Sequence, residues 1–158
     1  MKHATLCFLL KPEGKILLGY KKYGFGKGKF NGFGGKVKEN ETLEEAAVRE
    51  LHEETGIKTT ADNLRKVAEL SFFFPSAPDD GWDQVAHVFF ADSWEGEPIE
   101  SNEMRPEWVD IKNIPFDKMW QDDIHWLPLV LQKKRVKARF TFKEDNESIQ
   151  DMVLDELK

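Results

Sequence analysis

Apolar and polar residues alternate in short runs along most of the chain, a pattern typical of half-buried β-strands. Residues 5–10 and 15–20 form the first two runs, and the Lys-Pro-Glu-Gly segment between them predicts a tight turn. Further strands are predicted at residues 67–74, Gln84–Ala91, 107–111, 136–142 and Ile149–Leu157. The pattern therefore predicts a mixed β-sheet that begins with a hairpin.

A helical period replaces this alternation at residues 42–55, where apolar side chains recur at steps of three and four. Thr42 and Glu45 fit a capping box at its start, and Gly56 supplies a stop. A second helix is predicted at residues 122–133, with a bend at Pro128. Strands combined with two helices indicate an α/β fold.

Between the hairpin and the first helix, six glycines crowd into residues 24–35. Glycine tolerates positive φ angles and allows close approach of the backbone, so this segment is expected to be loop and short strand. Residues 75–83 carry two prolines and a glycine, which predicts an exposed loop.

The composition is that of a globular protein, with 158 residues, 40% hydrophobic and 33% charged. One domain, residues 1–158, is expected, because the chain has no internal repeat, low-complexity tract or linker. A net charge of -6 argues against a nucleic-acid polymer as partner. The basic pair at 21–22 leaves a local phosphate contact open, whereas a solvated face is the simpler interpretation of the run at 133–135.

Cys7 is the only cysteine, lies in an apolar run and is expected in the core. The apolar stretch at the start is too short for a signal peptide, and no segment approaches the roughly 20 apolar residues of a membrane span. We therefore expect a cytoplasmic protein, without a membrane partner, that works as a monomer.

Three acidic residues, Glu50, Glu53 and Glu54, share one face of the first predicted helix. Carboxylates gathered in this way repel one another, and hard oxygen ligands of this type suit Mg²⁺, or Mn²⁺. The alternative is an acidic face that is merely solvated. A metal site is favoured because the apolar stripe lies beside the acids and because Arg49 can pair with Glu53 one turn later. His52 is expected at the surface.

The spacing of these residues resembles the Nudix box, G-x5-E-x7-R-E-U-x-E-E-x-G-U. Every fixed position is matched, by Gly35, Glu41, Arg49, Glu50, Leu51, Glu53, Glu54, Gly56 and Ile57. Nine positions at set spacing make this signal far more specific than a lone glycine motif. The resemblance implies a Nudix α/β/α sandwich around a mixed sheet.

The resemblance also implies Mg²⁺-dependent attack of water on a phosphorus of a nucleoside diphosphate linked to another group. The metal ligands that it implies are Glu50, Glu53, Glu54, the Gly34 carbonyl and Glu103. Arg49 belongs to the same catalytic group. Glu53 is our first candidate for the general base, with Glu103 as the alternative.

Beyond the box, several strings resemble the MutT-homologue branch of the family, which hydrolyses oxidised purine nucleoside triphosphates. They occur at residues 21–26, 31–37, 103–106, 115–123 and 126–134. The substrate-binding residues implied by this resemblance are Thr5, Lys21, Asn31, Phe33, Gly34, Gly35, Lys36, Phe72, Phe74, Met104, Trp120, Gln121, Asp122 and Asp123.

Physical arguments support several of these assignments. Trp120, Phe72, Phe74 and Met104 would form a flat apolar slot for a purine, although strand spacing makes core packing an equal alternative for the two phenylalanines. The intervening Phe73 is expected in the core. Lys21 suits a triphosphate, and Asn31 suits a base edge or a turn.

Asp122 and Asp123 have two interpretations. Asp122 is expected either to cap the second helix or to join Asp123 in recognising the base, with one proton shared between them. The box does not select the nucleotide, so the alternatives are a broader pyrophosphatase for nucleotide sugars, dinucleoside polyphosphates or general triphosphates, and a non-catalytic nucleotide sensor.

Overall fold

The computed structural model describes residues 1–157, without the side chain of Asp80. The strands are β1 (Lys2–Lys11), β2 (Lys15–Lys21), β3 (Phe30–Asn31), β4 (Leu64–Phe73), β5 (Gln84–Ala91), β6 (Met104–Asp110), β7 (Arg135–Phe142) and β8 (Ile149–Leu157). The helices are α1 (Leu43–Thr55) and α2 (Asp123–Leu131). Short 3₁₀ turns lie at Ala61–Asn63, Asp80–Trp82, Ile111–Asn113 and Phe116–Lys118.

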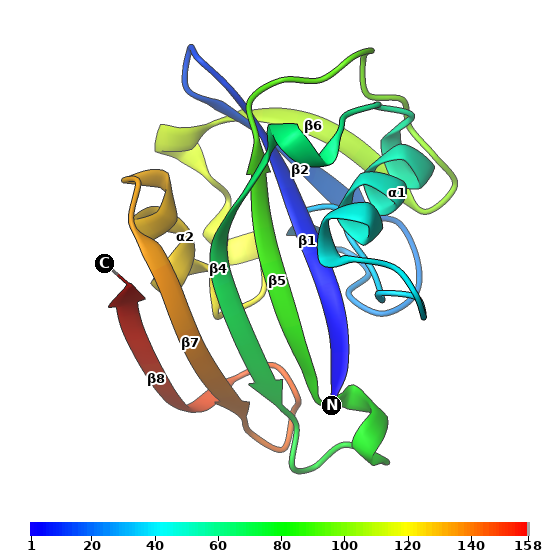
Figure 1. Ribbon diagram of the computed structural model, residues 1–158. Helices are drawn as coiled ribbons and strands as arrows, with labels where there is room; N and C mark the ends of the chain where they lie inside the picture. Colours follow the sequence, from blue (N-terminus) through cyan, green and yellow to red (C-terminus); the bar gives the residue numbers. More distant parts are fainter. Residues whose placement is uncertain (158) are drawn as a thin grey trace.

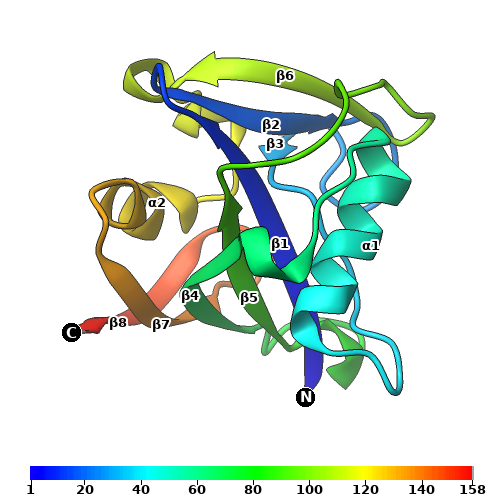
Figure 2. The same ribbon diagram turned by 45° about the horizontal axis from the view of Figure 1, so that its top comes forward.

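The strands form one mixed sheet in the order β3-β2-β1-β5-β4-β7-β8, and β6 pairs with β2. β1 is parallel to β5 and β4 is parallel to β7, while the other pairs are antiparallel. Figure 2 shows α1 and α2 on opposite sides of this sheet. The predicted α/β fold with a mixed sheet is confirmed.

Alternating residues of β1 serve two separate cores. Phe8 faces the core under α2, where it packs against Trp126 with ring centroids 6.2 Å apart. Cys7 and Leu9 face the opposite core, where Leu51 of α1 is fully buried. Because successive strand side chains point to opposite faces, one short sequence holds both helices onto the sheet. Burial raises the pKa of the Cys7 thiol to about 12.

Helix α1 begins and ends where the sequence indicates. The Thr42 hydroxyl accepts from Glu45 N at 3.0 Å, and the Glu45 carboxylate accepts from Thr42 N at 2.9 Å. Gly56 takes a φ of 78° and donates its N–H to the His52 carbonyl. The capping box and the stop are confirmed, and α1 packs against the sheet at β1 (Figure 1).

Several predictions about strands need correction. β1 and β4 begin at Lys2 and Leu64, each three residues earlier than predicted. β6 begins at Met104, three residues earlier than the predicted 107, because Met104 pairs with Lys21 and Pro106 pairs with Gly19 of β2. A proline is tolerated there because β6 is an edge strand. Phe73 is only partly buried and lies outside both cores, so its predicted core position is wrong.

In the described residues 1–157, no helix is both long enough and apolar enough to cross a bilayer.

Candidate active site

A cavity of about 250 Å³ opens between β1, β4, α2 and the glycine-rich stretch. Four residues predicted to bind substrate line its wall on the β1 side, namely Thr5, Asn31, Gly34 and Gly35. A Cβ at Gly34 would lie 1.7 Å from the Thr5 carbonyl oxygen, so only glycine allows the chain to pass this close to β1.

Phe72 of β4 and Phe74, just beyond the end of β4, also line the cavity together, as the strand spacing predicts. Their rings lie 6.0 and 4.8 Å from the ring of Phe142, which extends the aromatic wall. The other wall carries Lys21, Met104, Trp120 and the two aspartates. The structure thus brings an apolar slot and a set of charged groups into one cavity.

Three of the predicted substrate residues do not line this cavity. Phe33 is fully buried in the core with Cys7 and Leu51, and its assignment to the nucleotide site stays a prediction. Lys36 is exposed, and its backbone carbonyl accepts from Arg49 Nη2 at 3.1 Å. Gln121 is also exposed and lies outside the cavity wall.

The cavity also includes residues that sequence reasoning missed. Phe25 and Lys29 reach it from the glycine-rich stretch, and Gln84 reaches it from the start of β5. Gln84 is the strand partner of Phe72, so its place was in principle available from the register of two predicted strands. Phe25 stands in the string at residues 21–26 that resembles the MutT-homologue branch, which was the signal that could have marked it.

Asp122 and Asp123 are buried at the base of α2, with 3% and 2% of their surfaces exposed. Asp122 Oδ2 accepts from Trp126 Nε1 at 2.9 Å and makes no side-chain cap, so the capping alternative is wrong. Asp123 Oδ2 is buried without a hydrogen-bond partner among the described residues. Burial raises the pKa of Asp122, and burial together with the charge of Asp122 raises the pKa of Asp123 well above its usual range.

Glu54 of α1 adds a third, partly buried carboxyl to the cavity wall. Its Oε1 atom has no hydrogen-bond partner in the part of the chain that the structure describes. Burial, with the nearby charges of Glu50 and Glu103, raises the pKa of Glu54 to about 8. A carboxylate in this position needs a cation or a proton, and hard oxygen donors of this kind fit a divalent metal.

The backbone of Gly34 lies beside the Glu54 carboxylate, with which it forms a hydrogen bond. Phe33 O and Gly35 O accept from Cys7 N and Thr5 N of β1, so the Gly34 peptide group between them points the other way, toward α1. Across residues 1–157, leaving aside the Asp80 side chain, no three His, Cys, Asp or Glu side chains form a preassembled metal cage. Glu50 and Glu53 instead contact Arg49, and Glu103 pairs with Lys21.

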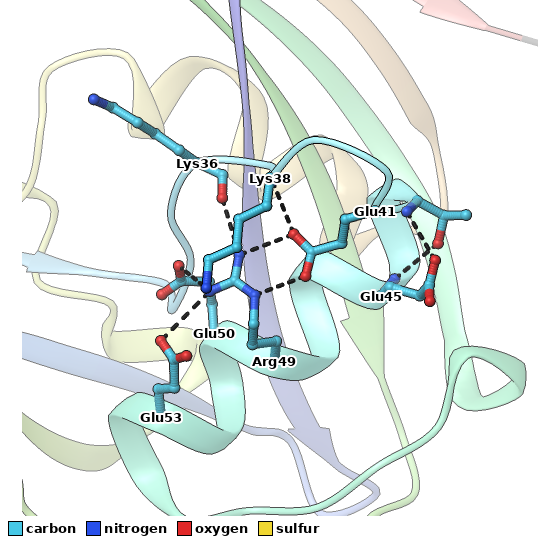
Figure 3. Close-up of polar contacts among 8 residues, drawn as sticks. Lys36, Lys38, Glu41, Glu45, Arg49, Glu50 and Glu53 are labelled. Atoms are coloured by element: carbon cyan, nitrogen blue, oxygen red, sulfur yellow. Dashed lines mark hydrogen bonds and ion pairs between the residues drawn. The ribbon is translucent and has the colours of Figure 1, made fainter.

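Arg49 organises the acidic face of α1 (Figure 3). Its guanidinium donates to both Glu41 oxygens at 2.7 and 3.0 Å, and to Glu50 Oε1 at 2.8 Å. The predicted pairing with Glu53 is present only as a long contact of 3.5 Å. The bidentate contact holds the pKa of Glu41 at about 2 and fixes the plane of the guanidinium, which in turn orients Glu50.

Glu41→Gln is expected to lower kcat/KM about 10-fold at limiting metal, because losing the bidentate partner of Arg49 leaves Glu50 without a fixed orientation. Steady-state kinetics over a range of Mn²⁺ concentrations measures this effect. The matched control is Glu39→Gln, an exposed glutamate in the same loop, which should behave as wild type. Equal activity of the two variants at limiting metal would contradict the role of Arg49.

The structure is thus an α/β protein in which a cavity with aromatic walls reaches a carboxylate-rich, metal-compatible end. Comparison with known proteins narrows this class. A model of the NUDIX domain matches residues 2–130, and the chain belongs to the Nudix hydrolase family, whose members generally use divalent metal ions.

Two relatives match nearly the whole chain. A Danio rerio protein named oxidized purine nucleoside triphosphate hydrolase is 50% identical over 157 residues, 99% of this chain and 96% of the relative. A Mus musculus protein of the same name is 47% identical over 142 residues, 90% of this chain and 87% of the relative.

Among solved structures, the mutator MutT protein from Bacillus halodurans superposes with a TM-score of 0.83 at 24% identity, over 98% of both chains. At this level of identity the likeness concerns the fold.

Proposed function

We propose that this protein hydrolyses oxidised purine nucleoside triphosphates, of the 8-oxo-dGTP and 2-hydroxy-dATP type, to a monophosphate and pyrophosphate. The observation that carries the proposal is the distribution of unpartnered buried oxygens among the described residues. Three of the four such atoms belong to Thr5, Glu54 and Asp123, all on the wall of this one cavity. Unsatisfied polar atoms are costly, so their concentration here points to a ligand that satisfies them.

The base of the nucleotide fits the end of the cavity that holds Trp120, Asp122 and Asp123. A pair of buried carboxyls with raised pKa values can share one proton near neutral pH, so that one donates and the other accepts. This arrangement matches the N1 and N2 donors and the O6 acceptor of an oxidised guanine, and moving the proton adapts it to other purines. Asn31 and Thr5 offer further polar atoms on the facing wall.

The phosphates fit the opposite end, near Lys21 and Glu54. Glu50, Glu53, Glu54, the Gly34 carbonyl and Glu103 would hold Mg²⁺, with Mn²⁺ as the alternative. When bound, the metal neutralises phosphate oxygens and lowers the pKa of the attacking water. Lys21 reaches the triphosphate as a point charge, because its side chain lines the cavity beside Glu103.

In the proposed step, the water oxygen attacks the β-phosphorus and a carboxylate of this chain takes the proton. The bond from the β-phosphorus to the oxygen that bridges it to the α-phosphorus breaks, and that oxygen leaves with the nucleoside monophosphate. Glu53 remains our first candidate for the base, because its side chain is 53% exposed and only loosely held by Arg49. Glu103, the alternative, is already paired with Lys21.

We further propose that the protein works as a monomer in the cytoplasm, which fits its single, buried, free cysteine.

The test is a panel of normal, 8-oxo and 2-hydroxy purine triphosphates, with ADP-ribose and diadenosine polyphosphates, in the presence of Mg²⁺. We expect the oxidised purine triphosphates to have the highest kcat/KM, with pyrophosphate and monophosphate as products. A preference for ADP-ribose or dinucleoside polyphosphates would instead support a broader pyrophosphatase. Binding without turnover would identify a sensor, and release of orthophosphate alone would overturn the site of attack.

A further inference from the structure

Trp82 lies in the loop between β4 and β5, close to the cavity mouth but outside the cavity wall. Its ring meets two aromatic rings edge to face. The centroid of Phe25 is 5.3 Å away at an interplanar angle of 79°, and that of Phe74 is 5.6 Å away at 73°. Phe25 and Phe74 both line the cavity, so Trp82 packs against the cavity wall from its outer side.

Phe25 needs such support, because 59% of its surface is exposed. It stacks on Trp120 with ring centroids 5.1 Å apart and an interplanar angle of 28°. The loop that carries it turns at Gly24 and Gly26, which have φ angles of 84° and 86°. A Cβ at Gly26 would lie 3.6 Å from Trp120, so the loop backbone rests directly on the indole. In the described residues, the rings of Trp82 and Trp120 are the aromatic partners of Phe25.

Trp82 itself is well anchored. Its loop is closed by Asp83 Oδ1, which accepts from Phe74 N at 2.8 Å, and by Ala77 N, which donates to the Phe74 carbonyl at 3.1 Å. Both Trp82 and Ala77 pack against the core under α2. The loop therefore offers a fixed edge against which the exposed Phe25 ring rests.

We propose that Trp82 is a positioning residue for substrate binding, which holds Phe25 over Trp120 and so preorganises an aromatic clamp at the base end of the cavity. The inference rests on the proposed function, because the clamp receives the base of a purine nucleotide. A group that is fixed before the ligand arrives loses less freedom on binding, so its support raises affinity. The ring contacts of Trp82 are with Phe25 and Phe74, so its effect belongs to binding rather than to the chemical step.

The test uses Trp82→Leu, which keeps apolar contact with the core but removes the aromatic edge, and Trp82→Phe, which restores a smaller edge. Titration calorimetry with a purine nucleoside monophosphate measures Kd, and steady-state assays give KM and kcat separately. We expect Trp82→Leu to raise Kd and KM about 5- to 10-fold, the scale of one or two aromatic contacts, while kcat stays within about twofold. Trp82→Phe should recover most of the affinity.

Phe25→Ala and the double variant test whether Trp82 acts through Phe25. The double variant should bind no more weakly than Phe25→Ala alone, because Trp82 has no effect once the Phe25 ring that it supports is absent. Trp94→Ala is the control, since Trp94 stacks on Trp108 beside the other core and lies outside the cavity wall. Its Kd and KM should equal those of wild type.

Unchanged Kd in Trp82→Leu, fully additive losses in the double variant, or a fall in kcat without a change in KM would each overturn the inference. If the wild type binds the monophosphate but does not hydrolyse triphosphates, the proposed reaction fails while the Kd comparison still decides the role of Trp82. Circular dichroism identifies any variant that does not fold. In that case the comparison of Trp82→Phe with wild type decides, and an unchanged Kd would contradict the positioning role of Trp82.

Discussion

Glu53→Gln is expected to lower kcat by at least about 100-fold while leaving the fold intact, because it removes a metal ligand or general base without changing the shape of the side chain. Structural cost should be small, since the Glu53 side chain is half exposed and its contact with Arg49 is long. Pyrophosphate release at saturating Mg²⁺ measures the effect, and the thermal midpoint Tm reports on the fold. Full activity in this variant would remove the assignment of the acidic face of α1 as the metal site.

Two further measurements separate the roles that Glu53 can have. Weaker Mn²⁺ binding by Glu53→Gln, followed by titration, indicates a ligand, whereas unchanged metal affinity with a lost basic limb in the pH profile indicates a general base. If Glu103→Gln shows the larger loss in kcat and changes the pH profile instead, the alternative base is correct. Glu13→Gln, an exposed glutamate in the turn between β1 and β2, is the matched control and should retain wild-type kcat.

The elements that the sequence predicts well are those with local signals. The capping box of Thr42 and Glu45, the stop at Gly56 and the bounds of β5 depend on residues a few positions apart. The early start of β6 depends instead on pairing of Met104 with Lys21, and the short β3 depends on pairing with β2, so neither has a local pattern to reveal it.

The same distinction applies to the site. The acids of α1 were predictable because one helix turn fixes their spacing, and Phe72 and Phe74 because a strand fixes theirs. The burial of Phe33 was not predictable, because glycines on both sides hide which face of the chain it occupies. The clamp of Phe25 and Trp82 joins two loops, and only the folded chain brings those loops together.

Asp123→Asn is expected to weaken catalysis and yet to stabilise the fold at alkaline pH. Loss of one charged hydrogen bond to the base should lower kcat/KM for 8-oxo-dGTP about 10-fold or more, on the scale of roughly 1.5 to 3 kcal/mol. Asp122→Asn should show a loss of similar size, because the two carboxyls act as a pair. The order of purine substrates and their pH profiles should change as well, since an amide cannot exchange the proton on which the proposed recognition depends.

The stability effect follows from the raised pKa of Asp123, which burial and the charge of Asp122 cause. In the unfolded chain the carboxyl loses its proton near pH 3.9, but in the folded chain it keeps the proton to a higher pH. The folded state therefore binds more protons, and the free energy of unfolding falls as pH rises from about 4 through the raised pKa. Asparagine does not ionise, so the free energy of unfolding of Asp123→Asn does not fall with pH for this reason. At pH 8 its Tm should exceed that of wild type by roughly 2–4 °C for each kcal/mol relieved, and the difference should shrink toward pH 4.

Differential scanning calorimetry across pH 4 to 8, without nucleotide, measures the expected gain in stability, which is then compared with the loss of activity. Asp117→Asn, an exposed aspartate in the 3₁₀ turn Phe116–Lys118, should alter neither kcat/KM nor the pH dependence of Tm. If Asp123→Asn lowers Tm equally at every pH, the Asp123 carboxylate has a structural partner within the protein, and its role is not to bind a ligand. If Tm rises at pH 8 but the ranking of purine substrates is unchanged, the buried charge is a cost unrelated to base recognition. Only the combination of a gain in stability and an altered purine preference ties the unpartnered Asp123 oxygen to the substrate.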